Sequence, residues 1–245
     1  MNARAGRFAG RLALVTGASR GLGAAAAVAL AVEGAELVLL ARTVGGLEET
    51  DDAVRRAGGR ATLVPIDLAD FDGLDRLGAA LHARGGKLDI LIGAAAHLGT
   101  LTPVAQADPK DWERTMAVNA TGHWRLLRSM DPLLRAAEAG RAVFVTDDVA
   151  MEAQPYWAAY AASKSALETV VRLYARECAK TRVRANLFVP GPMATRLRGH
   201  AFPGEASDRH PPPESAVPAL LQLADARCER TGGRARIENG ELRWS

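Results

Sequence analysis

The sequence of 245 residues has little cysteine, few aromatic residues and no long apolar run. Its two cysteines, Cys178 and Cys228, are too few for a disulfide framework, which favours a reducing compartment. No segment approaches the roughly 18 apolar residues that a membrane-spanning helix needs. The apolar stretch near the N-terminus is too short for a secretory signal peptide and runs into glycine. We therefore expect a cytoplasmic, soluble protein.

The sequence also lacks concentrated charge. Its formal net charge is +3, but Lys and Arg are scattered and form no basic stripe interleaved with aromatic residues. This distribution argues against a nucleic-acid partner. The five histidines show no metal-ligand spacing, and neither cysteine has partners nearby, so no metal site is predicted. With nucleic acid and metal disfavoured, we expect the partner to be a small molecule.

Short apolar runs alternate with helical patterns along the chain, and 48% of the residues are apolar. Uninterrupted apolar strands separated by helices predict a parallel sheet covered on both faces. We therefore expect one α/β domain over residues 1–245, a doubly wound Rossmann-type sheet. The predicted strands are 11–17, 35–42, 61–67, 88–96, 141–147 and 182–190, and the predicted helices are 22–33, 44–56, 71–85, 108–134, 156–179 and 216–226.

The segment TGASRGLG, residues 16–23, joins the first strand to the first helix. Gly17 permits a tight turn, Gly21 lets the backbone approach a pyrophosphate, and Gly23 permits close packing of the helix. The amide groups of the helix N-terminus then face the phosphates. This context predicts a dinucleotide cofactor.

Four motifs occur together and in order: Gly-x-x-x-Gly-x-Gly, Asn119, YAASK at 160–164 and VPGPMAT at 189–195. Between about Arg11 and Thr195 the sequence resembles the short-chain dehydrogenase/reductase family. The resemblance implies that the protein binds NAD(H) or NADP(H) and moves a hydride between nicotinamide and an alcohol or carbonyl carbon. It further implies a homodimer or homotetramer, paired through helices that here carry Trp112, Trp124 and Tyr174.

The same resemblance assigns cofactor contacts to the glycine turn, the ends of the next strands, the Tyr–Lys pair and the VPGPMAT segment. These residues are Gly17, Ser19, Arg20, Gly21, Leu22, Gly23, Arg42, Asp67, Leu68, Ala94, Ala95, Asn119, Tyr160, Lys164, Pro190, Gly191, Met193 and Thr195. Asp67 matches the family residue that meets the adenine.

Cofactor choice depends on the end of the second strand. NAD-binding sites usually place a carboxylate there, but this sequence has Arg42, with Arg20 in the glycine turn nearby. Two guanidinium groups suit a 2′-phosphate through charge-assisted hydrogen bonds. NADP(H) is therefore favoured, with NAD(H) as the alternative.

In the family, the tyrosine hydroxyl exchanges a proton with the substrate oxygen, and the lysine lowers its pKa and holds the nicotinamide ribose. Tyr160 and Lys164 match these roles, and Asn119 matches the asparagine that supports a water linked to the lysine. The family's serine lies about thirteen residues before the tyrosine. Here Asp147 or Asp148 occupies that place, depending on the alignment.

An ionised aspartate only accepts hydrogen bonds, so it cannot replace the donor function of serine. At about 4 Å and an effective dielectric near 20, it would oppose a tyrosinate by roughly 4 kcal/mol. Four outcomes stay open. Asp147 is protonated and donates, it binds a cationic substrate, it turns away and Thr146 supplies the hydroxyl, or redox chemistry is weakened or lost. The otherwise preserved catalytic set favours the protonated donor.

Further features bear on the substrate. Ala94 replaces a family asparagine that braces the sheet, which puts local rigidity in doubt. Residues 196–215 predict a substrate-lid loop, whose Arg196, Arg198 and His200 would favour an anionic substrate. Because of the acids near Tyr160, the alternatives to an oxidoreductase are a cofactor-binding sensor or structural subunit, and a lyase or isomerase that uses Tyr160 as a base.

Overall fold

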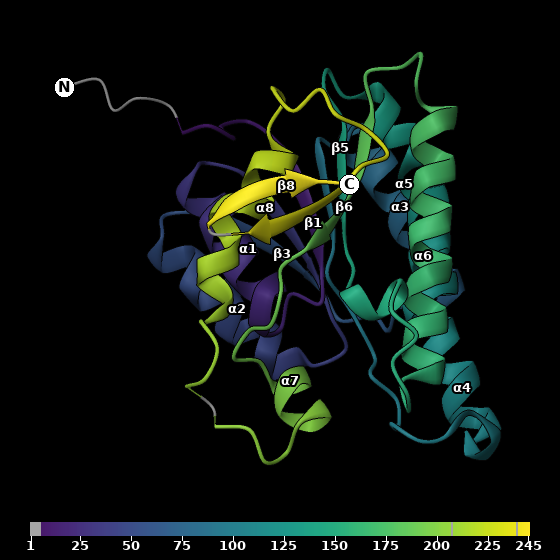
Figure 1. Ribbon diagram of the computed structural model, residues 1–245. Helices are drawn as coiled ribbons and strands as arrows, with labels where there is room; N and C mark the ends of the chain where they lie inside the picture. The colour runs from purple at the N-terminus through teal and green to yellow at the C-terminus, as the bar shows by residue number, and fades with distance from the viewer. Residues whose placement is uncertain (1–5, 207, 239) are drawn as a thin grey trace.

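The computed structural model describes residues 6–206, 208–238 and 240–245, which build one eight-stranded sheet between two layers of helices (Figure 1). The strand order is β3-β2-β1-β4-β5-β6-β7-β8, and only the last pair is antiparallel. The strands are β1 Leu12–Thr16, β2 Glu36–Leu40, β3 Arg60–Val64, β4 Ile90–Gly93, β5 Arg141–Val145, β6 Arg184–Val189, β7 Arg234–Glu238 and β8 Glu241–Trp244. The doubly wound fold expected from the sequence is confirmed.

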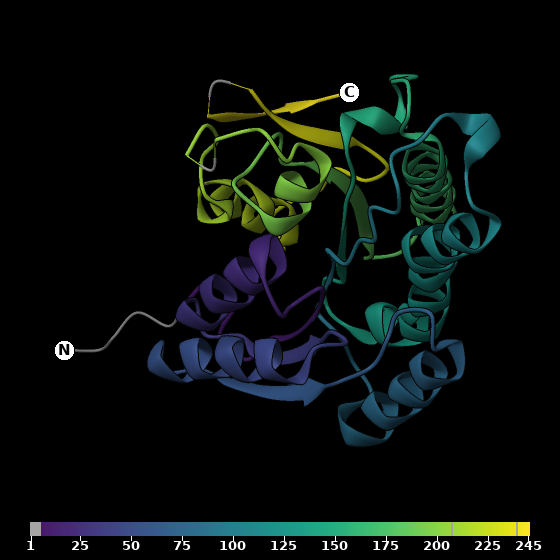
Figure 2. The ribbon, with the colours of Figure 1, turned by 90° about the horizontal axis from the view of Figure 1, so that it is seen from below.

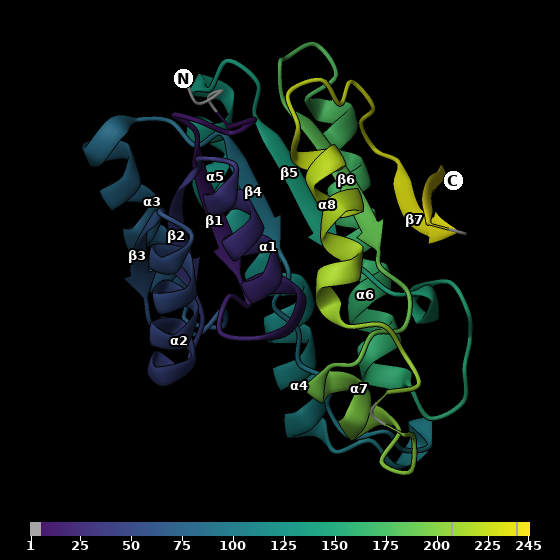
Figure 3. The ribbon, with the colours of Figure 1, turned by 90° about the vertical axis from the view of Figure 1, so that its left-hand side faces the viewer.

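Two groups of helices cover the sheet, and the view from below separates them (Figure 2). On one face, α1 packs against α2 and α8; on the other, α5 packs against α3 and α6, and α4 packs against α6 (Figure 3). The helices are α1 Gly21–Val32, α2 Val44–Arg56, α3 Phe71–Gly85, α4 Pro109–Met116, α5 His123–Ala136, α6 Ala158–Glu177, α7 Arg196–Ala201 and α8 Val217–Ala224. Among the described residues, no helix is long and apolar enough to cross a membrane.

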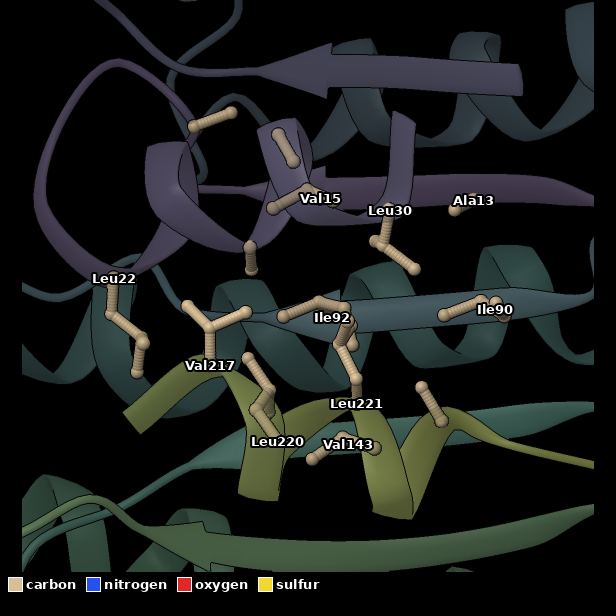
Figure 4. Close-up of a cluster of buried hydrophobic side chains, with 14 of the residues drawn as sticks. Ala13, Val15, Leu22, Leu30, Ile90, Ile92, Val143, Val217, Leu220 and Leu221 are labelled. Carbon is tan, nitrogen blue, oxygen red and sulfur yellow. The ribbon is translucent and has the colours of Figure 1, made fainter. Parts of the chain in front are cut away.

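The core on the α1 and α8 face joins apolar side chains of both helices to the sheet (Figure 4). Leu30 of α1 and Leu220 of α8 are fully buried against Ile92 of β4 and Val143 of β5. Each fully buried aliphatic side chain of this kind contributes about 1.5–3 kcal/mol. This packing fixes α1 behind the glycine turn and thereby orients the turn.

Three elements differ from the expectation. The predicted helix 108–134 is divided by a π-helical segment, Ala117–Gly122, and the predicted lid contains α7. The C-terminal hairpin of β7 and β8 was not predicted, because its short strands carry charged residues instead of an apolar run. The antiparallel strand β8 therefore adds an unpredicted edge to the parallel sheet that the sequence predicted.

Candidate active site

The glycine turn lies at the carboxyl end of β1, as dinucleotide binding requires. Gly17 has a φ of +67°, and a Cβ there would come within 2.8 Å of the Ala95 backbone. A Cβ on Gly23 would come within 2.4 Å of the Gly17 carbonyl oxygen. Glycine is therefore required at both positions, and the turn carries no side chain that would block a phosphate from the N-terminus of α1.

Arg20 and Arg42 both have partners at the carboxyl ends of neighbouring strands. The Arg20 guanidinium donates to the Thr43 hydroxyl at 3.5 Å, and Arg42 Nη1 lies 3.8 Å from Asp67 Oδ2. Arg114 of α4 also donates to Asp67. Although burial opposes the shift, hydrogen bonds from Ala69 and Arg114 lower the pKa of Asp67. The ionised Asp67 therefore holds Arg42 at this edge of the sheet.

Thr16 stabilises the end of β4, where the sequence has Ala94 in place of the family's asparagine and local rigidity was in doubt. Its hydroxyl oxygen accepts hydrogen bonds from the amides of Ala94 at 3.1 Å and Ala95 at 3.2 Å. It also lies 3.5 Å from the Ile92 carbonyl oxygen. The expected local loss of bracing is thus compensated from β1.

Tyr160 and Lys164 lie on one buried face of α6, where their four-residue spacing places them one turn apart. Lys164 Nζ donates to the Val145 carbonyl oxygen at 2.9 Å and lies 5.7 Å from the centre of the Tyr160 ring. Burial lowers the pKa of Lys164 to about 8, while the charge of Asp147 opposes the shift. Burial, and then Asp147, raises the pKa of the Tyr160 hydroxyl well above its usual range.

Asn119 is fully buried inside the π-helical segment and connects two loops of the site. Its side-chain oxygen accepts from the His97 amide at 2.7 Å, and its side-chain nitrogen donates to the His97 carbonyl at 2.8 Å and to Ser163 at 3.0 Å. The Ser163 hydroxyl in turn donates to the Tyr160 carbonyl oxygen at 2.7 Å. Asn119 therefore joins the loop after β4 to α6.

His123 is a buried partner of Asn119 that the sequence did not reveal. Its Nδ1 lies 3.0 Å from the Asn119 carbonyl oxygen, which requires a proton on Nδ1. Burial, reinforced by the charge of Lys164, lowers the pKa of His123 to about 3. The imidazole is therefore neutral at pH 7, and its Nδ1–H group donates a hydrogen bond to the main-chain oxygen of Asn119.

Asp147 and Asp148 follow β5 directly and have different surroundings. The Asp147 carboxylate accepts from the Val149 amide at 3.3 Å, and its charge acts on both Tyr160 and Lys164. Asp148 instead forms ion pairs with Arg234 at 2.9 Å and Arg236 at 2.5 Å. The structure therefore brings Asp147 to the tyrosine and directs Asp148 to β7.

Arg234 is the centre of a buried network behind the site. Its Nη2 donates to the Asp147 carbonyl at 3.1 Å, and its Nε donates to Glu168 Oε1 at 3.1 Å. The Thr146 hydroxyl donates to the same Glu168 oxygen at 2.9 Å. The hydroxyl proton of Thr146 is therefore used in the hydrogen bond to Glu168. This arrangement argues against Thr146 as the hydroxyl that donates to a substrate.

The sequence pattern described as short chain dehydrogenase matches residues 11–206. The chain belongs to this family. It is 31% identical over 216 residues to the oxidoreductase YciK of Escherichia coli K12, covering 87% of this chain and 85% of YciK. It is 35% identical over 204 residues to the NAD-dependent oxidoreductase Rv0687 of Mycobacterium tuberculosis H37Rv, covering 78% and 74% of the two chains.

A solved short chain dehydrogenase from Escherichia coli CFT073, complexed with NADPH, superposes with a TM-score of 0.88. It is 29% identical in sequence, and the match covers 96% of this chain and 99% of the other. Membership of the short chain dehydrogenase family, implied by the four motifs, is therefore confirmed, and with it the general class of oxidoreductase.

The remaining residues assigned to the cofactor line the same edge of the sheet. Gly21 lies beside Thr195, because a Cβ on Gly21 would stand 3.7 Å from the Thr195 methyl group. The glycine turn and the VPGPMAT segment therefore meet in space, although about 170 residues separate them in sequence. Ser19, Ala94, Pro190, Gly191 and Met193 are half-buried, and Leu22 and Leu68 are buried.

The short helix α7 lies over the tyrosine. Val149, Trp157 and Tyr160 form a buried cluster against which Leu197 of α7 and Phe202 pack. The Trp157 ring stands edge-on to Tyr160, with centroids 5.7 Å apart. Trp157 therefore packs against the Tyr160 ring, whereas His97 lies 3.4 Å from Asp111.

Of the three cationic side chains predicted to attract an anionic substrate, Arg196 and His200 are exposed, whereas Arg198 is held by an acid. Arg198 forms two hydrogen bonds with Glu205, at 2.5 Å and 2.9 Å, and His210 lies 3.0 Å from the same carboxylate. Hydrogen bonds from Arg198 and His210 lower the pKa of Glu205 to about 2. Glu205 therefore offsets the charge that was expected to attract an anionic substrate.

Proposed function

We propose that the protein is an NADP(H)-dependent oxidoreductase that moves a hydride between nicotinamide and a carbonyl or alcohol carbon. The observation that carries this proposal is the placement of Tyr160 and Lys164 on one buried face of α6, next to Asn119. In the proposed reaction the nicotinamide supplies or receives the hydride. Tyr160 donates a proton to the substrate oxygen during reduction and takes it back during oxidation.

The glycine turn supports the cofactor part of the proposal. The turn has no room for side chains at Gly17 and Gly23, and it is followed by the N-terminus of a twelve-residue helix. Arg20 and Arg42 then supply two guanidinium groups at the end of β2, which fit the 2′-phosphate of NADP(H). The NADPH-bound structure of a family member agrees with this choice, whereas the NAD-dependent relative shows that family membership alone does not decide it.

Lys164 has two functions in the proposed reaction. Its ammonium group, one helical turn from Tyr160, stabilises the tyrosinate that forms when the proton leaves, and it holds the nicotinamide ribose. The carboxylate of Asp147 acts in the opposite direction, since it raises the pKa of Tyr160. The balance between these charges decides how readily Tyr160 gives up its proton.

That opposition favours a second candidate function. A family member whose tyrosine releases its proton poorly, because burial and a neighbouring carboxylate raise its pKa, would bind the cofactor without rapid redox turnover, as a sensor or structural subunit does. The glycine turn and the two arginines serve this function equally well. The two candidates therefore differ only at Tyr160 and Asp147.

The decisive experiment measures binding and turnover separately. NADPH affinity is obtained by fluorescence titration, and NADPH oxidation is then followed against a panel of aldehydes and ketones. We expect both binding and turnover, and we expect Tyr160→Phe to abolish turnover in a protein that still binds NADPH. Binding without turnover on the whole panel would support the sensor, and an absence of NADPH binding would refute both candidates.

A further inference from the structure

The acidic side chains around Tyr160 divide into paired and unpaired groups. Asp148 has two arginine partners, Arg234 and Arg236, at 2.9 Å and 2.5 Å. Glu168 pairs with Arg172 at 3.0 Å and with Arg234 at 3.1 Å. Beyond these two acids, Asp111 has His97 as its partner, and Glu205 has Arg198, Arg209 and His210.

Asp147 is the exception. Across residues 6–206, 208–238 and 240–245, no cationic nitrogen lies within salt-bridge distance of its carboxylate, whose recorded partner is the Val149 amide at 3.3 Å. Lys164, on which the charge of Asp147 acts, donates its Nζ to the Val145 carbonyl oxygen instead. Arg234 contacts the Asp147 carbonyl oxygen and gives its other contacts to Asp148 and Glu168. The Asp147 carboxylate therefore has no cationic partner among the described residues and is available to pair with a cationic ligand.

The loop that carries this carboxylate contributes to an apolar and aromatic cluster around Tyr160. Val149, two residues after Asp147, shares a buried cluster with Trp157 and Tyr160. The partly buried side chains that complete the cluster are Ala96, Leu98, Leu101, Ala161, Leu197, Ala201 and Phe202. A carboxylate beside aromatic rings is a good environment for an organic cation, because the rings attract the cation while excluding water.

We infer that Asp147 binds a protonated nitrogen of the substrate, so that the substrate is an amino alcohol or amino ketone with an apolar body. This inference rests on the proposed function, in which Tyr160 receives the substrate oxygen. An ammonium group one or two bonds from the carbinol carbon can reach Asp147 while the oxygen meets Tyr160. The bound cation offsets the negative charge that otherwise opposes proton release from the tyrosine.

Charge placement elsewhere agrees with a cationic substrate. The helix that covers Tyr160 carries Arg198, whose guanidinium is held by Glu205 and stacks 3.7 Å from the centre of the Phe202 ring. Arg198 therefore does not repel an approaching cation as a solvated arginine would. Arg234 contacts the Asp147 main chain but is paired with Asp148 and Glu168, and the pKa of Lys164, about 8, makes its charge weaker as the pH rises toward 8.

The test compares two ligands of nearly equal shape. Phenylethanolamine carries an ammonium group where styrene glycol carries a neutral hydroxyl. Their affinities for the full-length protein are measured by calorimetry at pH 7, with and without NADPH. We expect phenylethanolamine to bind about tenfold more tightly, the scale of one charge-assisted contact. Asp147→Asn should remove this preference, whereas Glu152→Gln, which removes an exposed carboxylate from the same loop, should keep it.

The outcomes separate this inference from the proposed function. Equal affinities of the wild-type protein for the two ligands would overturn the inference, whether or not the variants fold. A preference that survives in a folded Asp147→Asn protein would overturn it as well. NADPH titration of the same samples decides the other question, because a protein that binds NADPH but shows no ammonium preference retains the proposed function and loses only the substrate class.

Discussion

The Oδ1 atom of Asp148 lies 2.9 Å from Nη2 of Arg234, a side chain 86 residues away in sequence. This contact explains why the chain carries two adjacent acids after β5. One acid anchors the loop to β7, and the other is thereby directed to Tyr160. The C-terminal hairpin thus fixes the loop in which the family resemblance places the serine.

Arg234 should contribute strongly to stability. Its side chain and that of Glu168 are each only 4% exposed, and removing one partner of a buried ion pair costs about 3 kcal/mol or more. We expect Arg234→Ala to lower the free energy of unfolding by that amount, measured by chemical denaturation. Arg243→Ala is the control, because its pair with Glu241 is exposed and is worth less than about 1 kcal/mol. Equal losses in the two variants would contradict the network.

Cofactor choice should depend on Arg42. If Arg42 and Arg20 hold the 2′-phosphate, NADPH binds at least about tenfold more tightly than NADH, a difference of roughly 1.4 kcal/mol. Arg42→Ala should reduce this ratio mainly by weakening NADPH binding, as measured by fluorescence titration of both cofactors. Arg56→Ala, an exposed arginine on α2, serves as the control. A ratio that Arg42→Ala leaves unchanged would exclude this arginine from the phosphate site.

Lys164 should titrate near pH 8. Burial lowers its pKa to about 8, and the Asp147 carboxylate partly offsets this shift. Turnover should therefore fall as the pH rises through about 8, because a neutral lysine no longer stabilises the tyrosinate. Asp147→Asn removes the opposing charge and should move this ionisation to lower pH, both in the pH profile of kcat/KM and in the NMR signal of labelled lysine. A shift to higher pH would contradict the assignment.

Assembly into a dimer or tetramer remains a prediction from the family resemblance. Trp112 on α4 and Trp124 on α5 are 37% and 45% exposed, as an interface would require. Tyr174 is buried within the subunit and donates to Asp131 at 2.7 Å, so its predicted place in the interface is not supported. We expect light scattering at micromolar concentration to give at least twice 25.9 kDa, and Trp124→Glu to reduce that mass. The control Val44→Glu, at an exposed position on α2, should leave the mass unchanged. A monomeric mass for the wild-type protein would refute assembly.

The sequence predicted the parts of the fold that follow from apolar runs and glycine placement. Leu12–Thr16, Gly17 and α1 could be derived because the chemistry of a strand, a tight turn and a helix is local. The hairpin of β7 and β8 was not predicted because arginines occupy strand positions in β7 and interrupt the apolar pattern. One signal was available: Arg234 and Arg236 alternate with apolar residues, which is the spacing of side chains on one face of a strand.

The site was predictable as a set of residue types but not as a set of contacts. The spacing from Tyr160 left Asp147 and Asp148 as alternatives for the serine position. A loop shorter by one residue would align Asp148 with that position instead of Asp147. Only the distant Arg234 and Arg236 separate the two acids. For the same reason Thr16 could not be recognised as the brace of the loop after β4, nor His123 as the partner of the Asn119 carbonyl. Hydrogen bonds between distant segments leave no periodic trace in sequence.

The substitution of Asp147 gives the sharpest prediction, because two interpretations of this residue differ in sign. A carboxylate that is charged opposes the tyrosinate, so Asp147→Ser should raise turnover of neutral ketones by about 10²–10³, the effect typical of one donor to a developing oxyanion. A protonated Asp147 would already donate, and Asp147→Ser would then bring no gain. Steady-state NADPH oxidation with a neutral ketone distinguishes the two.

We expect the gain, because Asp147 is only half-buried and lies close enough for its charge to act on both Tyr160 and Lys164. Asp147→Asn should gain less than Asp147→Ser, since an amide removes the charge but donates from a longer side chain. Asp148→Asn is the matched control: it should lower stability through its lost arginine contacts and leave the ketone turnover of the folded protein unchanged. If Asp147→Ser loses turnover while Asp148→Asn does not, Asp147 is a proton-bearing donor, and the cation subsite is wrong.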